Sequence, residues 1–224
     1  MRSFKGYTGV NTKEKIKRDA ERMLEKSLKD AYIASECLIA PNGDTNRKFA
    51  TEVQVFQKWD SDGDAMKVIG RIGEIERGNY IYYDNQVWLI MTKPEDNGIY
   101  RKAEMHLCST EFPVKENDKV EIVGIDDVGR PIKKTIKGGV LMMPCVPKMN
   151  DASTAIAETN TPINGLDNIV TITIPYKEAP SIAHDEIFTL YNEQYRIIRI
   201  DPSKSIMGIG ILKITGERLG RNDE

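Results

Sequence analysis

The amino-acid sequence contains no long apolar run. None of its apolar stretches approaches the roughly 20 residues that a membrane-spanning helix needs. Residues 1–7, at the start, also lack the apolar core of a signal peptide. We therefore expect a protein of the cytoplasm that has no membrane contact. Hydrophobic residues make up 40% of the 224 residues and charged residues 29%, which is typical of compact globular domains.

An excess of positive charge is also missing. The chain has 32 Lys and Arg against 34 Asp and Glu, which gives a net charge of −2. Proteins that hold nucleic acid tightly neutralise its phosphates with Lys and Arg. The balance therefore argues against tight general DNA binding, whereas it suits a protein through which DNA only passes.

Cysteine and histidine are scarce, and neither is spaced for metal binding. Cys37, Cys108 and Cys145 include no CxxC pair, so we expect them to be reduced and buried. His106 and His184 stand alone, without an HExxH motif. The sequence also lacks a GxSxG elbow and a complete P-loop. It therefore predicts no catalytic residue, no metal site and no cofactor, and we expect a protein that is not an enzyme.

The clearest local pattern begins at Asn11. Residues 11–14 form a capping box, in which the Asn and Glu14 side chains satisfy free amides at a helix start. A helical period then predicts an amphipathic helix up to Tyr32, with the apolar positions Ile16, Ala20, Met23, Leu24, Leu28, Ala31 and Tyr32. The opposite face is charged and is either solvated or in contact with a neighbouring subunit. It carries Lys13, Lys15, Lys17, Arg18, Glu21, Arg22, Glu25, Lys26 and Lys29.

Short segments with apolar and polar residues in alternation follow the turn residues 41–46. They predict strands at 51–57, 80–83, 87–92, 103–108, 119–125, 131–136, 140–143, 169–176, 186–191, 194–200 and 209–215. The expected fold class is mainly β with an N-terminal α-helix. A small antiparallel β-barrel or sandwich is followed by a second small β-domain.

Composition divides the chain into four parts. We expect an N-terminal arm and helix at residues 1–52 and a β-barrel domain at residues 53–147. Residues 148–168 are polar and poor in aromatic residues, so they are interpreted as a linker or long loop that marks the domain boundary. Residues 169–224 form the second β-domain with a short charged tail.

Two hairpin sequences, at residues 80–90 and 186–197, resemble each other. A constant offset aligns Ile81 with Phe188, Asn85 with Asn192, Trp88 with Tyr195 and Ile90 with Ile197. Two β-modules of related design would explain this similarity, and so would the convergence of two ordinary hairpins.

The segments Gly78–Thr92 and Ile99–Cys108 resemble a signature of small virion proteins from phages that infect Gram-positive bacteria. In those proteins a Gly-led strand, a Trp-Leu strand and a strand ending in Leu-Cys-Asn build a β-barrel. Here Ser109 replaces the Asn. The resemblance continues through Met143–Val146 and Tyr195–Asp201, so it covers most of the chain in order.

Such virion proteins are head-closure or head-to-tail connector subunits. The resemblance implies a ring homo-oligomer that joins the portal to the tail, helps to retain packaged DNA and presents a platform to the tail. Its partners would be further copies, the portal or adaptor protein and tail or neck proteins, while DNA passes without tight binding. The expected location is the head-tail neck of the virion, after assembly in the host cytoplasm. A neck or tail completion protein and a baseplate protein remain alternatives.

A β-barrel that binds nucleic acid is the alternative from a different functional class. Such a module needs a positive groove with stacking aromatic rings. The chain lacks this positive charge, although it has aromatic rings that could stack on bases. These rings are Trp59, Tyr80, Tyr82, Tyr83 and Trp88.

The N-terminal arm and the helix are the predicted partner interface. Aromatic residues are common interface anchors, and Phe4 and Tyr7 lie on an otherwise polar arm. Closely spaced charges on the helix would supply register and specificity. The predicted interface residues are Phe4, Tyr7, Lys13, Lys17, Arg18, Glu21 and Glu25.

Overall fold

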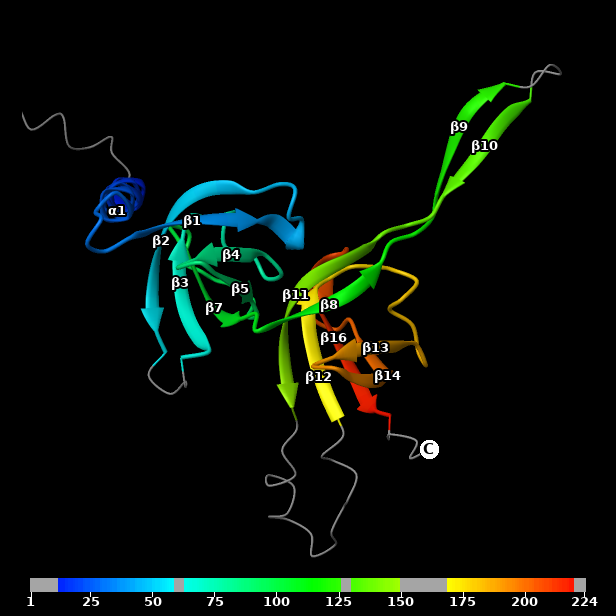
Figure 1. The fold of residues 1–224 in the computed structure, drawn as a ribbon. Helices are drawn as coiled ribbons and strands as arrows, with labels where there is room; N and C mark the ends of the chain where they lie inside the picture. Colours follow the sequence, from blue (N-terminus) through cyan, green and yellow to red (C-terminus); the bar gives the residue numbers. More distant parts are fainter. Residues whose placement is uncertain (1–11, 59–62, 126–129, 150–168, 220–224) are drawn as a thin grey trace, which may run out of the picture. The chain divides into compact units, whose positions relative to one another are not determined.

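The computed structural model describes residues 12–58, 63–125, 130–149 and 169–219 (Figure 1). Within these ranges the chain has one α-helix, α1 (Thr12–Leu28), and consists otherwise of strands and their connections. The expected mainly β class with an N-terminal helix is therefore confirmed. The chain forms two compact units, residues 1–107 and 108–224, and each has its own hydrophobic core.

The first unit is a closed antiparallel barrel. Going around it, the strand order is β1, β2, β3, β7, β5 and β4, and β4 pairs again with β1. These strands are β1 (Ser35–Ala40), β2 (Phe49–Gln57), β3 (Ala65–Gly70), β4 (Tyr80–Tyr83), β5 (Gln86–Ile90) and β7 (Arg101–Leu107). The short strand β6 (Glu95–Asp96) also pairs with β7, and the 3-10 turn η1 (Pro41–Gly43) follows β1.

The core of the first barrel comes from the inward side of each strand. Successive strand residues point to opposite faces, so alternate positions are buried. Trp88 is the largest of these side chains and is only 1% exposed. It packs in a cluster with Ile39, Val53, Val68, Ile81, Ile90 and Met105.

The second unit contains a six-stranded sheet in the order β8, β11, β12, β16, β14 and β13. The strands are β8 (Thr110–Lys115), β11 (Val140–Met149), β12 (Ile169–Pro175), β13 (Ile187–Leu190), β14 (Glu193–Asp201) and β16 (Ile209–Arg218). The short strand β15 (Ser205–Ile206) pairs with β16. Phe188 makes an edge contact with Phe112 at 5.1 Å and stacks on Tyr195 at 5.6 Å between ring centroids. These contacts bring β8 and β13 together into a barrel-like core.

The two units have the same strand order. Each strand of the first barrel has a counterpart at the same place in the second. The counterparts are β1 and β8, β2 and β11, β3 and β12, β7 and β16, β5 and β14, and β4 and β13. The pairing registers make the inward residues of the two barrels equivalent. The equivalent pairs are Ile39 and Val114, Val53 and Cys145, Val68 and Ile172, and Trp88 and Tyr195. Agreement over six strands favours an internal duplication over the convergence of two hairpins.

The hairpins that the sequence aligned also share their turns. Asp84 and Asn85 join β4 to β5 with φ values of 51° and 57°, and Tyr191 and Asn192 join β13 to β14 with 51° and 64°. Two consecutive residues with positive φ form the tight turn that suits a two-residue hairpin. The predicted alignment of these hairpins therefore holds at the level of backbone geometry.

One difference between the barrels lies at the seam that closes them. In the first unit β1 pairs with β4, and Leu38 lies opposite Tyr82. Pro113 takes the place of Leu38 in β8 and has no N–H to donate. The N–H of Lys115 donates instead to Ser181 Oγ at 2.8 Å. The described strands β8 and β13 are accordingly joined by side-chain packing, and no strand ladder connects them.

The division into units differs from the predicted domains. The boundary falls between Leu107 and Cys108, so the expected barrel domain at 53–147 is split and the expected linker at 148–168 is not the boundary. The reason is that β11 pairs with both β8 and β12, which places it inside the second sheet. Residues 150–168 lie outside the described residues.

The helix is shorter than predicted, and some strands were not predicted. It ends at Leu28 instead of Tyr32, and Ser35–Ala40, expected to belong to the helical part, is strand β1. Strand β3 was also missed, as was β8 in the second unit. Pairing with β2 and β4 decides the conformation of β1, and this pairing is non-local.

We predict that Trp88→Ala lowers the free energy of unfolding by about 3–5 kcal/mol, because it leaves a cavity in a closed barrel. Chemical denaturation followed by circular dichroism measures this loss. The matched control is Tyr32→Ala, which removes a fully exposed ring and should change the stability by less than about 0.5 kcal/mol. Equal stability of the Trp88→Ala and wild-type proteins would contradict the prediction.

Candidate assembly surfaces

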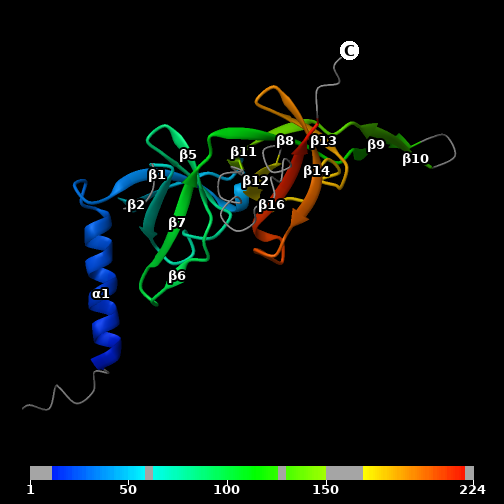
Figure 2. The same cartoon turned by 90° about the horizontal axis from the view of Figure 1, so that it is seen from below.

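Helix α1 contacts the first barrel mainly through its C-terminal turn. Leu28 is 1% exposed, whereas Ile16 and Met23 on the apolar stripe are 63% and 74% exposed. Figure 2 shows the helix extending away from the strands of the first unit. At 1.5 Å per residue its 17 residues span about 25 Å. Most of the apolar stripe is therefore left uncovered by the described part of the chain.

Arg71 fixes the end of this helix to the barrel. Its guanidinium donates to both oxygens of Glu25, from Nε at 2.8 Å and from Nη2 at 3.0 Å. It also donates to Glu52 at 3.0 Å and to Thr51 Oγ1 at 2.9 Å, so one cation joins the helix to β2. The hydrogen bond from Arg71 lowers the pKa of Glu25. The partly buried position of Arg71 strengthens this bidentate contact.

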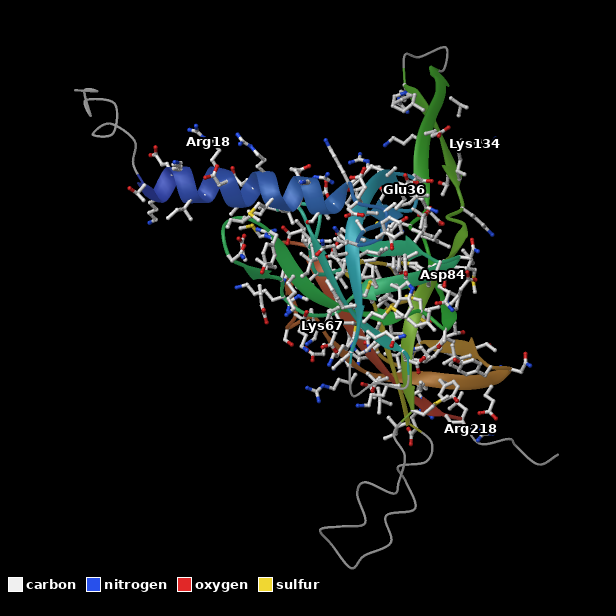
Figure 3. All side chains as sticks on the ribbon, turned by 90° about the vertical axis from the view of Figure 1, so that its left-hand side faces the viewer. Arg18, Glu36, Lys67, Asp84, Lys134 and Arg218 are labelled. Carbon is white, nitrogen blue, oxygen red and sulfur yellow. The ribbon has the colours of Figure 1, made fainter. Side chains whose placement is uncertain are left out.

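The structure places the predicted interface residues in different settings. Lys17 and Glu21 form an exposed i,i+4 ion pair at 3.8 Å, and Arg18 extends into solvent (Figure 3). Lys13 is also exposed. Glu25 is turned toward its own barrel by Arg71, a contact between residues 46 positions apart that no local pattern reveals. Phe4 and Tyr7 lie outside the described residues.

A second projecting element interrupts the second unit. Strands β9 (Lys119–Ile125) and β10 (Pro131–Ile136) pair only with each other and form a two-stranded sheet between β8 and β11 (Figure 1). Both strands were predicted, but as part of a barrel. Ile122 and Val123 are adjacent residues and therefore lie on opposite faces, yet they are 66% and 60% exposed. Neither face of this hairpin is covered within the described chain.

The base of the hairpin is tightly built. Gly138 donates its N–H to Asp118 Oδ1 at 2.9 Å. A Cβ atom at this position would meet the carbonyl oxygen of Glu116 at 2.0 Å, so any larger residue would force the backbone apart. The two ends of the hairpin are therefore held close together. Lys133 and Lys134 are exposed on β10, and Figure 3 labels Lys134.

The other side chains that could take part in chemistry are held in contacts within the barrels or are buried. Glu104 accepts hydrogen bonds from Lys58 at 2.8 Å and contacts His106 Nε2 at 2.9 Å, and its pKa is lowered chiefly by Lys58. Cys37 and Cys145 are buried, as expected, and burial raises the pKa of each to about 12, whereas Cys108 is only partly buried. Among the described residues no cluster of His, Cys, Asp and Glu is arranged to hold a metal ion.

Comparison with protein families divides the chain in the same way. Residues 10–107 match the YomX N-terminal domain, and residues 130–217 match the YomX C-terminal domain. The SPbeta prophage-derived protein YomX of Bacillus subtilis (strain 168) is 29% identical over 221 residues, and the alignment covers 97% of each chain. The chain is therefore a phage-derived protein with two β-barrel-like domains. The two matches follow each other along the chain in N-terminal to C-terminal order.

Solved structures of MrkH from K. pneumonia also align with the chain. Two of them cover 92% of this chain and 85% and 87% of their own, at 10% and 11% identity and TM-scores of 0.22 and 0.21. Such low TM-scores carry no argument about fold or function. In the described ranges no helix has the length and apolar character to cross a membrane.

We predict that Glu25→Gln lowers the free energy of unfolding by about 1 kcal/mol at neutral pH, because both partners of this pair are partly screened by solvent. A carboxyl whose pKa is lowered in the folded state stabilises the protein above its unfolded pKa of about 4.3. That contribution is lost as the pH falls through the folded pKa. The difference between wild type and variant should therefore shrink from about pH 6 to about pH 3.

Denaturation curves at several pH values test this prediction. Glu21→Gln is the matched control, since Glu21 pairs only with Lys17 on the exposed face, and it should have little effect. A constant difference between wild type and Glu25→Gln across this pH range would contradict the assigned ion pair.

Proposed function

We propose that this phage-derived chain is a non-catalytic virion subunit, which forms a head-closure or connector ring between the portal and the tail and helps to retain packaged DNA. The observation that carries the proposal is the pair of projecting elements, helix α1 and the β9–β10 hairpin. Each is firmly based on a barrel, and each leaves apolar side chains uncovered. Isolated two-stranded hairpins are marginally stable, so this one gains stability from a partner.

Two unlike projecting elements support the proposed ring. In that ring the helix and the hairpin of one copy meet surfaces of another kind on the next copy, and the contact is heterologous. Repeated heterologous contacts between identical subunits close into a ring when the rotation between neighbours permits. Portal, adaptor, tail and neck proteins would occupy the faces of the ring. The net charge of −2 suits a channel that lets DNA pass without holding it.

Nucleic-acid binding as the main function is less well supported. Tyr80 and Trp88, two rings that could have stacked on bases, are buried in the first barrel at 0% and 1% exposure. A neck or tail completion protein or a baseplate protein would use the same kind of subunit contacts. The position of the protein in the particle separates these alternatives.

We predict that cryo-electron microscopy of phage particles finds this protein as a ring at the head-tail neck. Particles assembled with Ile122→Asp/Val123→Asp should contain less of the protein, because the charges oppose burial of the hairpin. Lys133→Asp/Lys134→Asp serves as a control that adds the same side chains to exposed basic positions of the same hairpin. Density at the baseplate would favour the baseplate alternative. Particles that lack the protein altogether would overturn the proposal.

A further inference from the structure

The outer face of the first barrel carries a groove over β1, β2 and β4. Its volume is about 540 Å³. The floor is formed by Leu38, Ala50 and Tyr82, which face outward side by side because Leu38 pairs with Ala50 on one side and with Tyr82 on the other. Leu38 is 43% exposed, which is high for a leucine in a central strand. The floor is therefore an apolar surface with Leu38 exposed at its centre.

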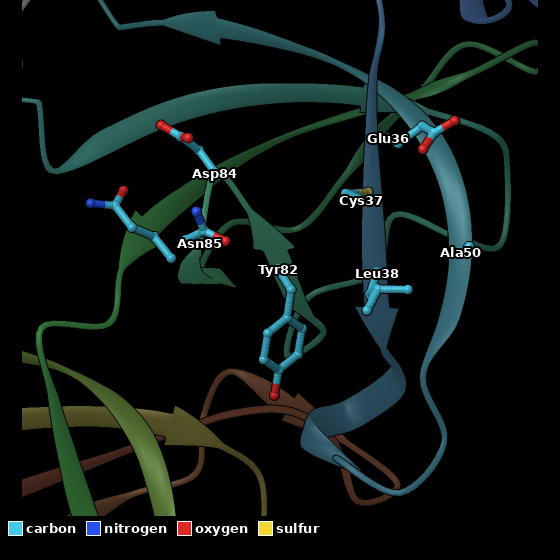
Figure 4. A pocket seen from close by; sticks show the side chains of 8 residues that line it. Glu36, Cys37, Leu38, Ala50, Tyr82, Asp84 and Asn85 are labelled. Atoms are coloured by element: carbon cyan, nitrogen blue, oxygen red, sulfur yellow. The ribbon is translucent and has the colours of Figure 1, made fainter.

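The rim of the groove is acidic. Glu36 and Asp84 lie on two sides of the floor, and their carboxylates are visible in Figure 4. Within the described part of the chain neither forms an ion pair. Lys48 is the basic residue at the floor, where its Nζ lies 3.8 Å from the centre of the Tyr82 ring. This groove can accept an apolar segment that is flanked by positive charge.

The distal half of helix α1 has these properties. From Lys13 to Arg18 it carries four basic residues and one acidic residue, and Ile16 is exposed among them. The proximal half, residues 19–28, has more acidic than basic residues. Positive charge and an exposed apolar side chain are thus concentrated at the end that is farthest from the barrel.

The helix of the same copy is directed away from this groove. Leu28 and the Glu25–Arg71 pair fix its C-terminal turn to the barrel, and a straight helix carries Ile16 about 18 Å farther out. Figure 2 shows this direction. An occupant with the chemistry of the distal helix must therefore come from another copy.

We propose that the groove formed by Glu36, Leu38, Ala50, Tyr82 and Asp84 binds the distal half of helix α1 from a neighbouring copy of this chain. Ile16 covers the apolar floor, and Lys13 and Lys17, which lie beside Ile16 on one side of the helix, pair with the acidic rim. The contact is of the helix-in-groove type. It rests on the proposed ring function and names the surfaces that join one subunit to the next.

A charge-exchange experiment tests this contact in the full-length protein. The groove variant is Glu36→Lys/Asp84→Asn. Asn is used at residue 84 because it tolerates the positive φ of 51° at that position. The helix variant is Lys13→Glu/Lys17→Glu. The matched control is Glu186→Lys/Asp185→Asn, which makes the same charge changes at exposed residues of the second unit, including a position with φ of 66°. Circular dichroism verifies that each variant is folded.

Sedimentation equilibrium measures self-association of each protein at several salt concentrations. The groove variant and the helix variant, each measured alone, should weaken self-association by about tenfold or more, and the control should not. A mixture of groove and helix variants should associate more tightly than either variant alone, because opposite charges again face each other at one interface. Association of the wild-type protein should weaken as salt rises.

The outcomes separate this inference from the proposed function. Unchanged association of both variants, with rings still present in particles, would overturn the groove contact and leave the ring function standing. A wild-type protein that neither associates nor occurs in particles would overturn both. Loss of DNA binding in the helix variant, without loss of self-association, would assign the basic helix to DNA and overturn the groove contact.

Discussion

The ion pair between Arg71 and Glu25 determines how the first unit presents its helix. A 17-residue helix of this composition would be marginal in water without tertiary contacts. Arg71 holds its last turn against β2, and Leu28 is buried beside it. Ile16 and Met23 on the rest of the helix are exposed, and both the proposed ring and the groove contact depend on this arrangement.

Duplication of the barrel has left two units with equivalent cores and different attachments. The second barrel replaces Ile81 and Trp88 by Phe188 and Tyr195 at the same positions. Gly216 leaves room for the Phe188 ring, since a Cβ atom there would lie 2.7 Å from that ring. The two cores are therefore packed differently, although their strands follow the same order.

The β9–β10 hairpin lies in a connection between two neighbouring strands, where a barrel tolerates insertion. The connection between β1 and β2 in the first unit contains the short turn η1, and the equivalent connection between β8 and β11 in the second unit contains the β9–β10 hairpin. A connection between neighbouring antiparallel strands can lengthen without changing the ladder on either side. The hairpin is therefore inserted at a connection that holds only a short turn in the described part of the first unit.

Local patterns in the sequence determined the mainly β class, the start of helix α1, the burial of Trp88 and the tight turns at Asn85 and Asn192. These features depend on residues that are close in the chain, so periodicity and turn chemistry reveal them. Tertiary structure alone decided that Ser35–Ala40 is a strand, that β8 and β11 belong to the second unit and that Glu25 faces Arg71. Each of these depends on partners far apart in sequence, and only the folded barrel brings those partners within hydrogen-bonding distance.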